Sequence, residues 1–311
     1  MAGAVTVAVV GSKDVASELG KKGTSSDITL FNHVRDGHAL TVIEPTQFPE
    51  KFPPLLYALA MAHRAVFVVP GLTREVAETA ATLEMFDLPV SVRLRSEVGP
   101  EEFRRVLKGS RLENAPAESF DPTQLRGEVD GWSVPPKPGP VRVVLDHAFP
   151  VKGVGAVALG IVHQGTLRAH DRLRLYPTES EVEVRSVQVH DVDVREATTG
   201  ERVGIALKGV EAEALARGQV LAPPGSLSVS TSVRAGGFER SRYYRGPLAP
   251  GTQLQLLVGL QLVPAKLEEA GAGSIRLTPD RPVAHEAAAP IVLADLSPPS
   301  GPRIVGRARL G

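Results

Sequence analysis

The chain of 311 residues contains no cysteine, which excludes disulfide bonds, thiolate metal sites and cysteine nucleophiles. Aromatic residues make up only 5% of the chain, so cores built from its 42% of hydrophobic residues must be mostly aliphatic. No run of about 18 apolar residues occurs, so we expect no membrane-spanning helix. The first eleven residues lack a basic segment, which argues against a signal peptide and predicts a cytoplasmic protein.

Net charge is also absent, because 35 basic side chains balance 35 acidic ones. The composition therefore gives no general sign of binding to nucleic acids or membranes. The charge is unevenly spread, since residues 226–311 hold ten basic and six acidic side chains. The histidines show no metal-ligand spacing, and neither HExxH nor GxSxG occurs, so we expect no metal site.

Residues 1–132 alternate apolar β-branched runs with segments of helical periodicity. This alternation predicts an α/β domain whose parallel sheet is covered on both faces. Thr73 is expected to cap the clearest helix. The expected strands are 4–10, 39–44, 66–69 and 89–94, and the expected helices are 52–65, 73–87 and 99–109.

Four prolines between positions 133 and 140 predict a stiff linker and a domain boundary. Beyond it, short apolar runs are separated by Gly, Asp and Pro turns, without a long helical pattern. Regularly spaced short strands of this kind are typical of small barrels. We expect one β-barrel over residues 141–225 and a second over residues 226–311.

The first of these barrels carries a family resemblance. Glycines at positions 153, 155, 160 and 165 punctuate an apolar alternation in residues 149–177, and residues 198–225 continue the pattern. Both stretches resemble the second domain of the EF-Tu superfamily of translational GTPases. In detail they are more similar to the selenocysteine-specific (SelB) branch, and specifically to archaeal SelB-like proteins with a decayed nucleotide site. The resemblance implies a GTPase-like α/β domain followed by two barrels.

The loop after the first strand begins as a phosphate-binding loop does, but its chemistry is missing. The motif GxxxxGK[ST] uses glycine amides and a lysine to hold phosphates, and a hydroxyl to hold Mg²⁺. Aligned on Gly11, its second glycine falls on Ala16, its lysine on Ser17 and its hydroxyl on Glu18. We therefore expect a degenerate nucleotide loop.

Two further GTPase motifs of the family are altered as well. The DxxG motif would lie at residues 44–47, where Glu44 replaces the aspartate and Gln47 replaces the glycine. The guanine-binding NKxD motif would lie at residues 94–97, where Arg95 and Glu97 keep the charges but the asparagine is gone. Three altered motifs predict a protein that is not an enzyme, has lost GTP hydrolysis and needs no cofactor.

The resemblance implies a pocket for the aminoacyl end of tRNA in the first barrel. The family uses an Asp-His pair after the first strand and an arginine on a later strand. Asp146, His147 and Arg202 stand at these positions. The alternative is an ordinary ion pair between Asp146 and Arg202 at a strand end.

A basic and aromatic segment in the second barrel is the candidate RNA-binding surface. Arginines contact phosphates, and aromatic rings stack on bases. In the RNA-binding interpretation, Arg303, Arg307 and Arg309 could extend the basic surface. The alternative interpretation is a solvated hairpin without a binding role. The candidate residues are Arg234, Arg240, Arg242, Tyr243, Tyr244 and Arg245.

The favoured interpretation is a SelB/EF-Tu-like homologue that binds tRNA or ribosomal RNA without GTP hydrolysis. One alternative is an elongation factor that binds nucleotide unusually, through the lysines and hydroxyls of residues 20–26. Another is a scaffold that binds protein partners through the former switch surface, residues 35–53. Because the chain ends after the second barrel, we expect no C-terminal domain of the SelB kind and no selenocysteine decoding.

Overall fold

The computed structural model describes residues 3–271 and 273–311. Their contacts group into two compact units, and each is described by itself. The first unit contains the chain up to Ser133 together with Arg240–Gly246 and Ala294–Arg307. The second contains Val134–Glu239, Pro247–Leu293 and Ala308–Gly311.

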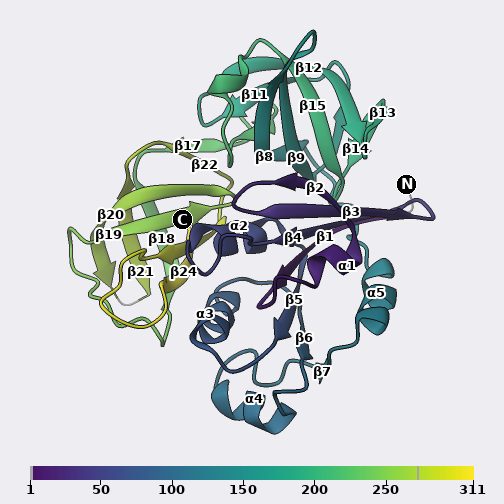
Figure 1. Ribbon diagram of the computed structural model, residues 1–311. Helices are drawn as coiled ribbons and strands as arrows, with labels where there is room; N and C mark the ends of the chain where they lie inside the picture. Colours follow the sequence, from purple (N-terminus) through teal and green to yellow (C-terminus); the bar gives the residue numbers. More distant parts are fainter. Residues whose placement is uncertain (1–2, 272) are drawn as a thin grey trace. The chain divides into compact units, whose positions relative to one another are not determined.

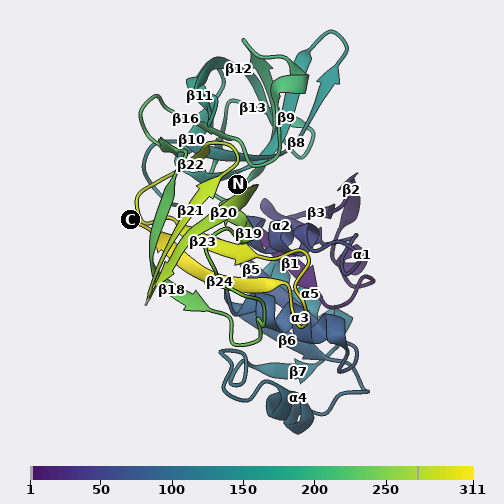
Figure 2. The ribbon, with the colours of Figure 1, turned by 90° about the vertical axis from the view of Figure 1, so that its left-hand side faces the viewer.

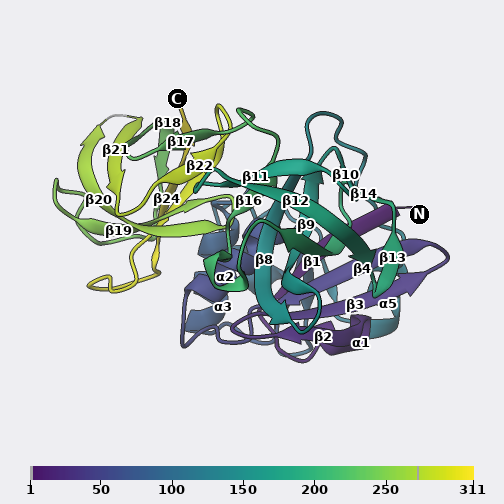
Figure 3. The ribbon, with the colours of Figure 1, turned by 90° about the horizontal axis from the view of Figure 1, so that it is seen from above.

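The N-terminal residues form a seven-stranded sheet with the order β2-β3-β4-β1-β5-β6-β7. Helices α2 and α3 lie on one side of it, and α1 and α5 on the other (Figures 1 and 3). The elements are β1 (Gly3–Val10), α1 (Ala16–Leu19), β2 (Lys21–Ser25), β3 (Thr29–Arg35), β4 (His38–Glu44), α2 (Pro53–Met61), β5 (Arg64–Val69), α3 (Arg74–Leu83), β6 (Val90–Leu94), α4 (Pro100–Val106), β7 (Ala117–Ser119) and α5 (Pro122–Asp130).

The predicted strands and helices of this part are confirmed, with helix ends that are shorter than expected. Strand β1 runs parallel to β4 and β5, and its side chains are buried on both faces from Ala4 to Val10. Thr73 caps α3, since its hydroxyl accepts a hydrogen bond of 3.3 Å from the backbone N–H of Val76.

The predicted parallel sheet is confirmed, and one of its edges carries antiparallel strands that the sequence analysis did not expect. Strands β2 and β3 pair antiparallel, and β3 pairs antiparallel with β4. The β3–β4 turn holds Asp36 and Gly37 at φ +51° and +76°, and an Asp-Gly pair is a known hairpin signal. Helix α5 was also missed, although Asp121 caps it and Pro122 opens it, as helix starts often do.

The first barrel closes with six strands in the order β11-β16-β8-β9-β15-β12, because β11 also pairs with β12. Its core is aliphatic, mostly Val, Leu, Ile and Ala. The elements are β8 (Arg142–Val151), β9 (Gly155–Gln164), β10 (Thr166–Arg168), β11 (Arg172–Tyr176), β12 (Ser180–Val189), β13 (Val192–Val194), β14 (Glu196–Thr198), β15 (Arg202–Lys208), the 3₁₀ turn η1 (Ala212–Ala214) and β16 (Val220–Ala222).

The second barrel is also closed, in the order β18-β21-β20-β19-β23-β24, and Figure 2 shows its strands facing the viewer. The elements are β17 (Ser228–Ser230), β18 (Val233–Arg240), β19 (Gln253–Val258), β20 (Gln261–Gly271), β21 (Ser274–Pro279), β22 (Val283–His285), β23 (Pro290–Ala294) and β24 (Ile304–Leu310). The predicted class, an α/β domain followed by two β-barrels, is confirmed.

Candidate functional site

The carboxyl ends of the parallel strands bring the predicted nucleotide-loop residues to one edge of the sheet. Strands β4, β1, β5 and β6 run parallel in this order, so the loops after Glu44, Val10, Val69 and Leu94 meet at the same edge. In open α/β sheets this edge is where ligands bind. The structure therefore brings the predicted nucleotide-loop residues to a single edge of the sheet.

The loop after β1 is a tight turn into a very short helix. Gly11 has φ +90°, and a Cβ atom there would lie 2.1 Å from the backbone oxygen of Val68, so only glycine fits. Helix α1, which begins at Ala16, has four residues. Ser17 and Glu18 are exposed on it, and the Ser17 hydroxyl donates to the backbone oxygen of Asp14 at 2.9 Å.

An ion pair connects this loop with the loop after β6. Arg95 Nη2 lies 2.6 Å from Asp14 Oδ2, and the Arg95 guanidinium lies 4.8 Å from the ring centre of Phe120. The Ser12 hydroxyl donates to the same carboxylate. The Ser12 hydrogen bond and the Arg95 charge together hold the pKa of Asp14 below its ordinary value. Glu97, further along the loop, is exposed and accepts from the Ser96 hydroxyl at 3.0 Å.

Glu44 is a buried acid at this edge. It is only 6% exposed, and within the described residues no hydrogen-bond partner reaches its Oε2. Burial raises the pKa of Glu44 to about 7, and the negative charge of Asp14 adds to this effect. The positive charges of Lys13 and Lys22 act in the opposite direction but are weaker than burial. The side-chain oxygen of Gln47 is likewise buried, and no described atom donates to it.

The two segments on which the alternative interpretations depend, residues 20–26 and 35–53, both contribute strands to the sheet. The proposed phosphate-binding residues 20–26 mostly form β2, an edge strand with exposed lysines, rather than a loop. In the former switch segment, residues 39–45 are buried in and just after β4.

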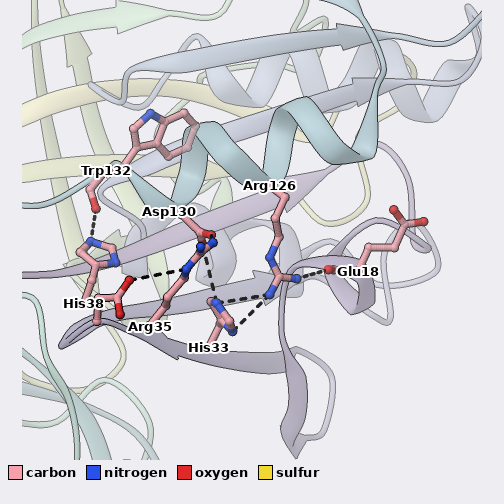
Figure 4. A network of polar contacts seen from close by, with 8 residues as sticks. Glu18, His33, Arg35, His38, Arg126, Asp130 and Trp132 are labelled. Atoms are coloured by element: carbon pink, nitrogen blue, oxygen red, sulfur yellow. Dashed lines mark hydrogen bonds and ion pairs between the residues drawn. The ribbon is translucent and has the colours of Figure 1, made fainter.

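A polar network holds helix α5 against α1 and β3, and sequence reasoning missed it (Figure 4). Arg126 of α5 donates to the backbone oxygen of Glu18 and lies 3.2 Å from Nδ1 of the His33 ring. Asp130, at the end of α5, pairs with Arg35 at 3.3 Å and with His33 at 3.8 Å. Partners so distant in the sequence carry no local pattern that could have revealed them.

The first barrel brings together the three residues predicted to form its pocket. Asp146 sits in a β-bulge, where the β8–β9 register shifts between Leu145 and His147. A bulge turns a side chain away from its regular direction. Asp146 Oδ1 lies 2.8 Å from Arg202 Nη2 and 2.5 Å from His147 Nδ1. The predicted alternative, an Asp146–Arg202 ion pair, is therefore present within the same cluster.

This cluster is buried, and the charges of its members interact strongly with one another. The Asp146 side chain is 0% exposed and that of Arg202 is 9% exposed. Burial alone would raise the pKa of Asp146, but Arg202 and His147 outweigh it and hold the pKa below its ordinary value. Arg217 donates to the Asp146 backbone oxygen at 3.2 Å and thereby fixes the bulge.

The predicted RNA-binding segment divides into structural and exposed residues. Tyr244 is 2% exposed and donates to Asp295 Oδ2 at 2.8 Å, so its ring cannot stack on a base and the prediction is wrong for this residue. Arg240 donates to the backbone oxygen of Gly246 at 2.7 Å and lies over the Tyr244 ring at 5.4 Å, which indicates a structural role.

The remaining members of the segment face outward. Arg234 and Arg245 are exposed. Arg242 is exposed as well, donates to the backbone oxygen of Lys108 at 3.0 Å and lies 4.7 Å from the centre of the partly exposed Tyr243 ring. Each of these four side chains, and the exposed Arg240, could contact a ligand.

The prediction that arginines of β24 and the residue before it extend this basic surface is largely wrong. Arg303 forms a two-point ion pair with Glu78, with Nε–Oε1 at 2.9 Å and Nη2–Oε2 at 2.6 Å. Its guanidinium also lies 4.9 Å from the ring centre of Phe52. Arg307 pairs with Asp87 at 2.7 Å. Both guanidinium groups are therefore engaged in protein contacts.

Among the residues that the structure describes, no group of three or more histidine, aspartate or glutamate side chains could hold a metal ion. No helix in that part of the chain is long and apolar enough to cross a membrane.

Comparison with known proteins agrees with this architecture. Residues 155–222 match the family described as Elongation factor Tu domain 2. An uncharacterized protein of Methanocaldococcus jannaschii is 33% identical over 294 residues, which cover 94% of this chain and 95% of that protein. The selenocysteine-specific elongation factor of the same organism is 26% identical over 84% of this chain, which spans 61% of that factor's length.

Solved structures share the fold. The elongation factor SelB of Methanococcus maripaludis, crystallised with the GTP analogue GppNHp, gives a TM-score of 0.84 at 21% identity and covers 99% of this chain and 79% of its own. A bacterial selenocysteine-specific elongation factor gives 0.82 at 20% identity, with 99% and 58% covered. The chain therefore belongs to the family of the uncharacterized M. jannaschii protein, among the SelB-like relatives of the EF-Tu superfamily of translation elongation factors.

Proposed function

We propose that this protein is a SelB/EF-Tu-like homologue that has lost GTP hydrolysis and acts by binding RNA, either tRNA or ribosomal RNA. The observation that carries the first half is the ion pair between Asp14 and Arg95. It joins directly the two loops that, by their place in the family's motifs, would hold the phosphates and the guanine base. The protein's own side chains thus make the connection that a nucleotide would make.

The chemistry of the surrounding residues supports this proposal. Ser17 and Glu18 occupy the positions of the phosphate-binding lysine and the magnesium-binding hydroxyl. The buried Glu44 adds a second acid at the same edge. A carboxylate about 4 Å from another negative charge costs roughly 1–4 kcal/mol for effective dielectric constants between 80 and 20. These residues therefore do not fit a magnesium–nucleotide complex.

The RNA-binding half of the proposal is supported by the exposed basic side chains of β18 and the segment after it. Arg234, Arg242 and Arg245 can contact phosphates, and the Tyr243 ring, held beside Arg242, can stack on a base. Their barrel lies in the part of the chain with an excess of basic residues. Two relatives are named as translation elongation factors, which makes an RNA of the translation machinery the preferred partner.

Calorimetry with GTP, GDP and ATP in the presence of Mg²⁺ tests the loss of nucleotide chemistry. We expect no dissociation constant tighter than about 10 µM, which corresponds to roughly 7 kcal/mol. GTP turnover by the pure protein that is abolished by Lys21→Ala or Lys22→Ala, which alter exposed lysines of residues 20–26, would contradict the proposal and favour the nucleotide-dependent alternative.

Filter binding with unfractionated tRNA at about 50 and 200 mM salt tests the RNA-binding half. We expect weaker retention at the higher salt. Arg234→Ala and Arg245→Ala should each lower the slope of the logarithm of the binding constant against the logarithm of the salt concentration by about one, because each removes one phosphate contact. Arg172→Ala is the matched control, because it removes one exposed arginine from β11 of the other barrel. Absence of salt-dependent retention would refute RNA binding.

A further inference from the structure

Strand β2 forms one edge of the N-terminal sheet. The strand order places it outside β3, and in the described part of the chain no strand pairs with its other side. Of its residues only Thr24 is half-buried, and the others are exposed. The backbone of an edge strand presents a row of N–H and C=O groups to which another strand can add. In an antiparallel pair every second residue points these groups away from its partner, so β2 carries groups that β3 does not use.

Hydrogen bonds at its C-terminal end hold β2 in place. The Ser25 hydroxyl lies 3.0 Å from the Thr29 hydroxyl on β3, which in turn lies 2.6 Å from the hydroxyl of Thr46. The backbone N–H of Ser26 donates to the backbone oxygen of Ile28 at 2.8 Å and closes the turn between the two strands. A strand that is already ordered loses little conformational entropy when a partner binds to it.

The regular part of this edge is its N-terminal half. Lys21 and Lys22 pair with β3 in continuous register, whereas the register shifts between Lys22 and Ser25. Such a bulge bends the strand and interrupts the ladder. Gly20, directly before β2, is also extended, with φ −164° and ψ 169°. A partner strand would therefore align with residues 20–22, which include both lysines.

The two lysines determine which kind of strand this edge accepts. Successive side chains of a strand point to opposite faces, so Lys21 and Lys22 place one exposed ammonium group on each face of β2. The described lysines that form ion pairs are Lys13, Lys208 and Lys266, so neither lysine of β2 is paired with a described carboxylate. Lysines on an edge strand oppose pairing with strands that cannot balance their charge.

Charge complementarity selects one occupant among the candidates. A second copy of β2 would place its lysines opposite those of the first, and like charges at opposed positions destabilise a strand pair. The phosphates of RNA could balance the charge, but they have no hydrogen to donate to the outward carbonyl groups of β2. An extended acidic peptide supplies both the backbone donors and the carboxylates.

We propose that the edge of β2 is a docking site for an acidic segment of a protein partner, which adds to the sheet as an extended strand beside Lys21 and Lys22. The partner's backbone pairs with the outward N–H and C=O groups of residues 20–22, and its carboxylates lie opposite the two ammonium groups. This surface contains none of the exposed arginines of the second barrel, so the inference does not depend on the proposed RNA binding.

The first experiment follows amide hydrogen exchange of the full-length protein with two synthetic peptides. One alternates glutamate with threonine, and the other alternates lysine with threonine. We expect the glutamate peptide alone to slow exchange within residues 20–22 by about tenfold. Slower exchange with the lysine peptide, or with neither peptide, would overturn the inference. Protection of these amides by oligouridylate but not by the glutamate peptide would assign the lysines to RNA and would overturn it as well.

A second measurement separates strand addition from simple charge attraction and uses the unaltered protein. The glutamate peptide with methylated backbone nitrogens keeps its carboxylates but has no N–H group to donate to β2. We expect calorimetry to detect binding of the unmethylated peptide only. Equal affinities would show that charge alone holds the peptide, which is incompatible with strand addition.

Reversing the charge of the edge gives the corresponding test on the protein side. The double substitution Lys21→Glu and Lys22→Glu should weaken binding of the glutamate peptide about tenfold and strengthen binding of the lysine peptide by a similar factor, because attractive and repulsive cross-strand pairs are exchanged. Lys108→Glu with Lys152→Glu is the matched control, since it changes the net charge equally at exposed lysines outside β2 and should leave both affinities unaltered. Equal effects of the two double substitutions would refute docking at β2.

Discussion

Replacing Glu44 by glutamine should remove a pH-dependent loss of stability from the N-terminal sheet. Burial raises the pKa of Glu44 from its ordinary 4.5 to about 7. Between these two values the folded chain keeps the proton while the unfolded chain releases it. The free energy of unfolding therefore falls as pH rises through this window and changes no further above the folded pKa.

The magnitude follows from the difference between the two pKa values. Each pKa unit corresponds to about 1.4 kcal/mol, so a rise from 4.5 to about 7 costs about 3 kcal/mol when complete. Part of this cost is already present at pH 5. Between pH 5 and pH 8 the contribution of Glu44 should therefore fall by roughly 2–3 kcal/mol. Glu44→Gln cannot ionise and should lack this component.

Guanidinium unfolding followed by tryptophan fluorescence is a suitable assay. Trp132 is the single tryptophan of the chain, and the Arg64 guanidinium lies 4.2 Å from the centre of its ring, so its emission reports on the N-terminal unit. Glu50→Gln is the matched control, because Glu50 is an exposed glutamate that pairs with Lys13. Parallel pH profiles for the wild type and Glu44→Gln would refute the argument that burial raises the pKa of Glu44.

Three further substitutions test the structure by calorimetric melting. Gly11→Ala should destabilise the protein by at least about 2 kcal/mol, because the new Cβ would lie 2.1 Å from a backbone oxygen at a positive φ; an unchanged melting temperature would contradict that close approach. Asp146→Ala should cost about 3–5 kcal/mol by leaving Arg202 buried without its counter-charge, and a loss below about 1 kcal/mol would show that solvent reaches the cluster. Tyr244→Phe should cost about 1 kcal/mol through the lost hydrogen bond, so full stability would argue that this hydroxyl is solvated.

Sequence reasoning succeeded where the signal is local. Strand β1 is a continuous β-branched and apolar run, and Thr73 is a cap that its own helix start requires. Strand periodicity and turn residues also identified both barrels. The edge hairpin β2–β3 was missed because β2 is polar and exposed and shows no apolar alternation.

The candidate sites were predicted in part. Parallel strands deliver their carboxyl ends to one edge, so motif positions alone placed Gly11, Glu44 and Arg95 near one another. That Arg95 would pair with Asp14, 81 positions away, depends on the path of the chain between them. The contact between Asp146 and Arg202, 56 positions apart, likewise depends on the pairing of β8, β9 and β15 and on the bulge that holds Asp146.

The sequence by itself determined the element types, the glycine positions and the serine at position 17, where the phosphate-binding motif has its lysine, because each depends on residues close in the chain. Only the tertiary structure decided which charged and aromatic side chains are available to a ligand. Arg303 binds Glu78 across 225 positions, and Tyr244 is buried beside Asp295, although both resemble surface residues in the sequence. Burial and long-range pairing arise from packing between distant segments, and local composition does not encode that packing.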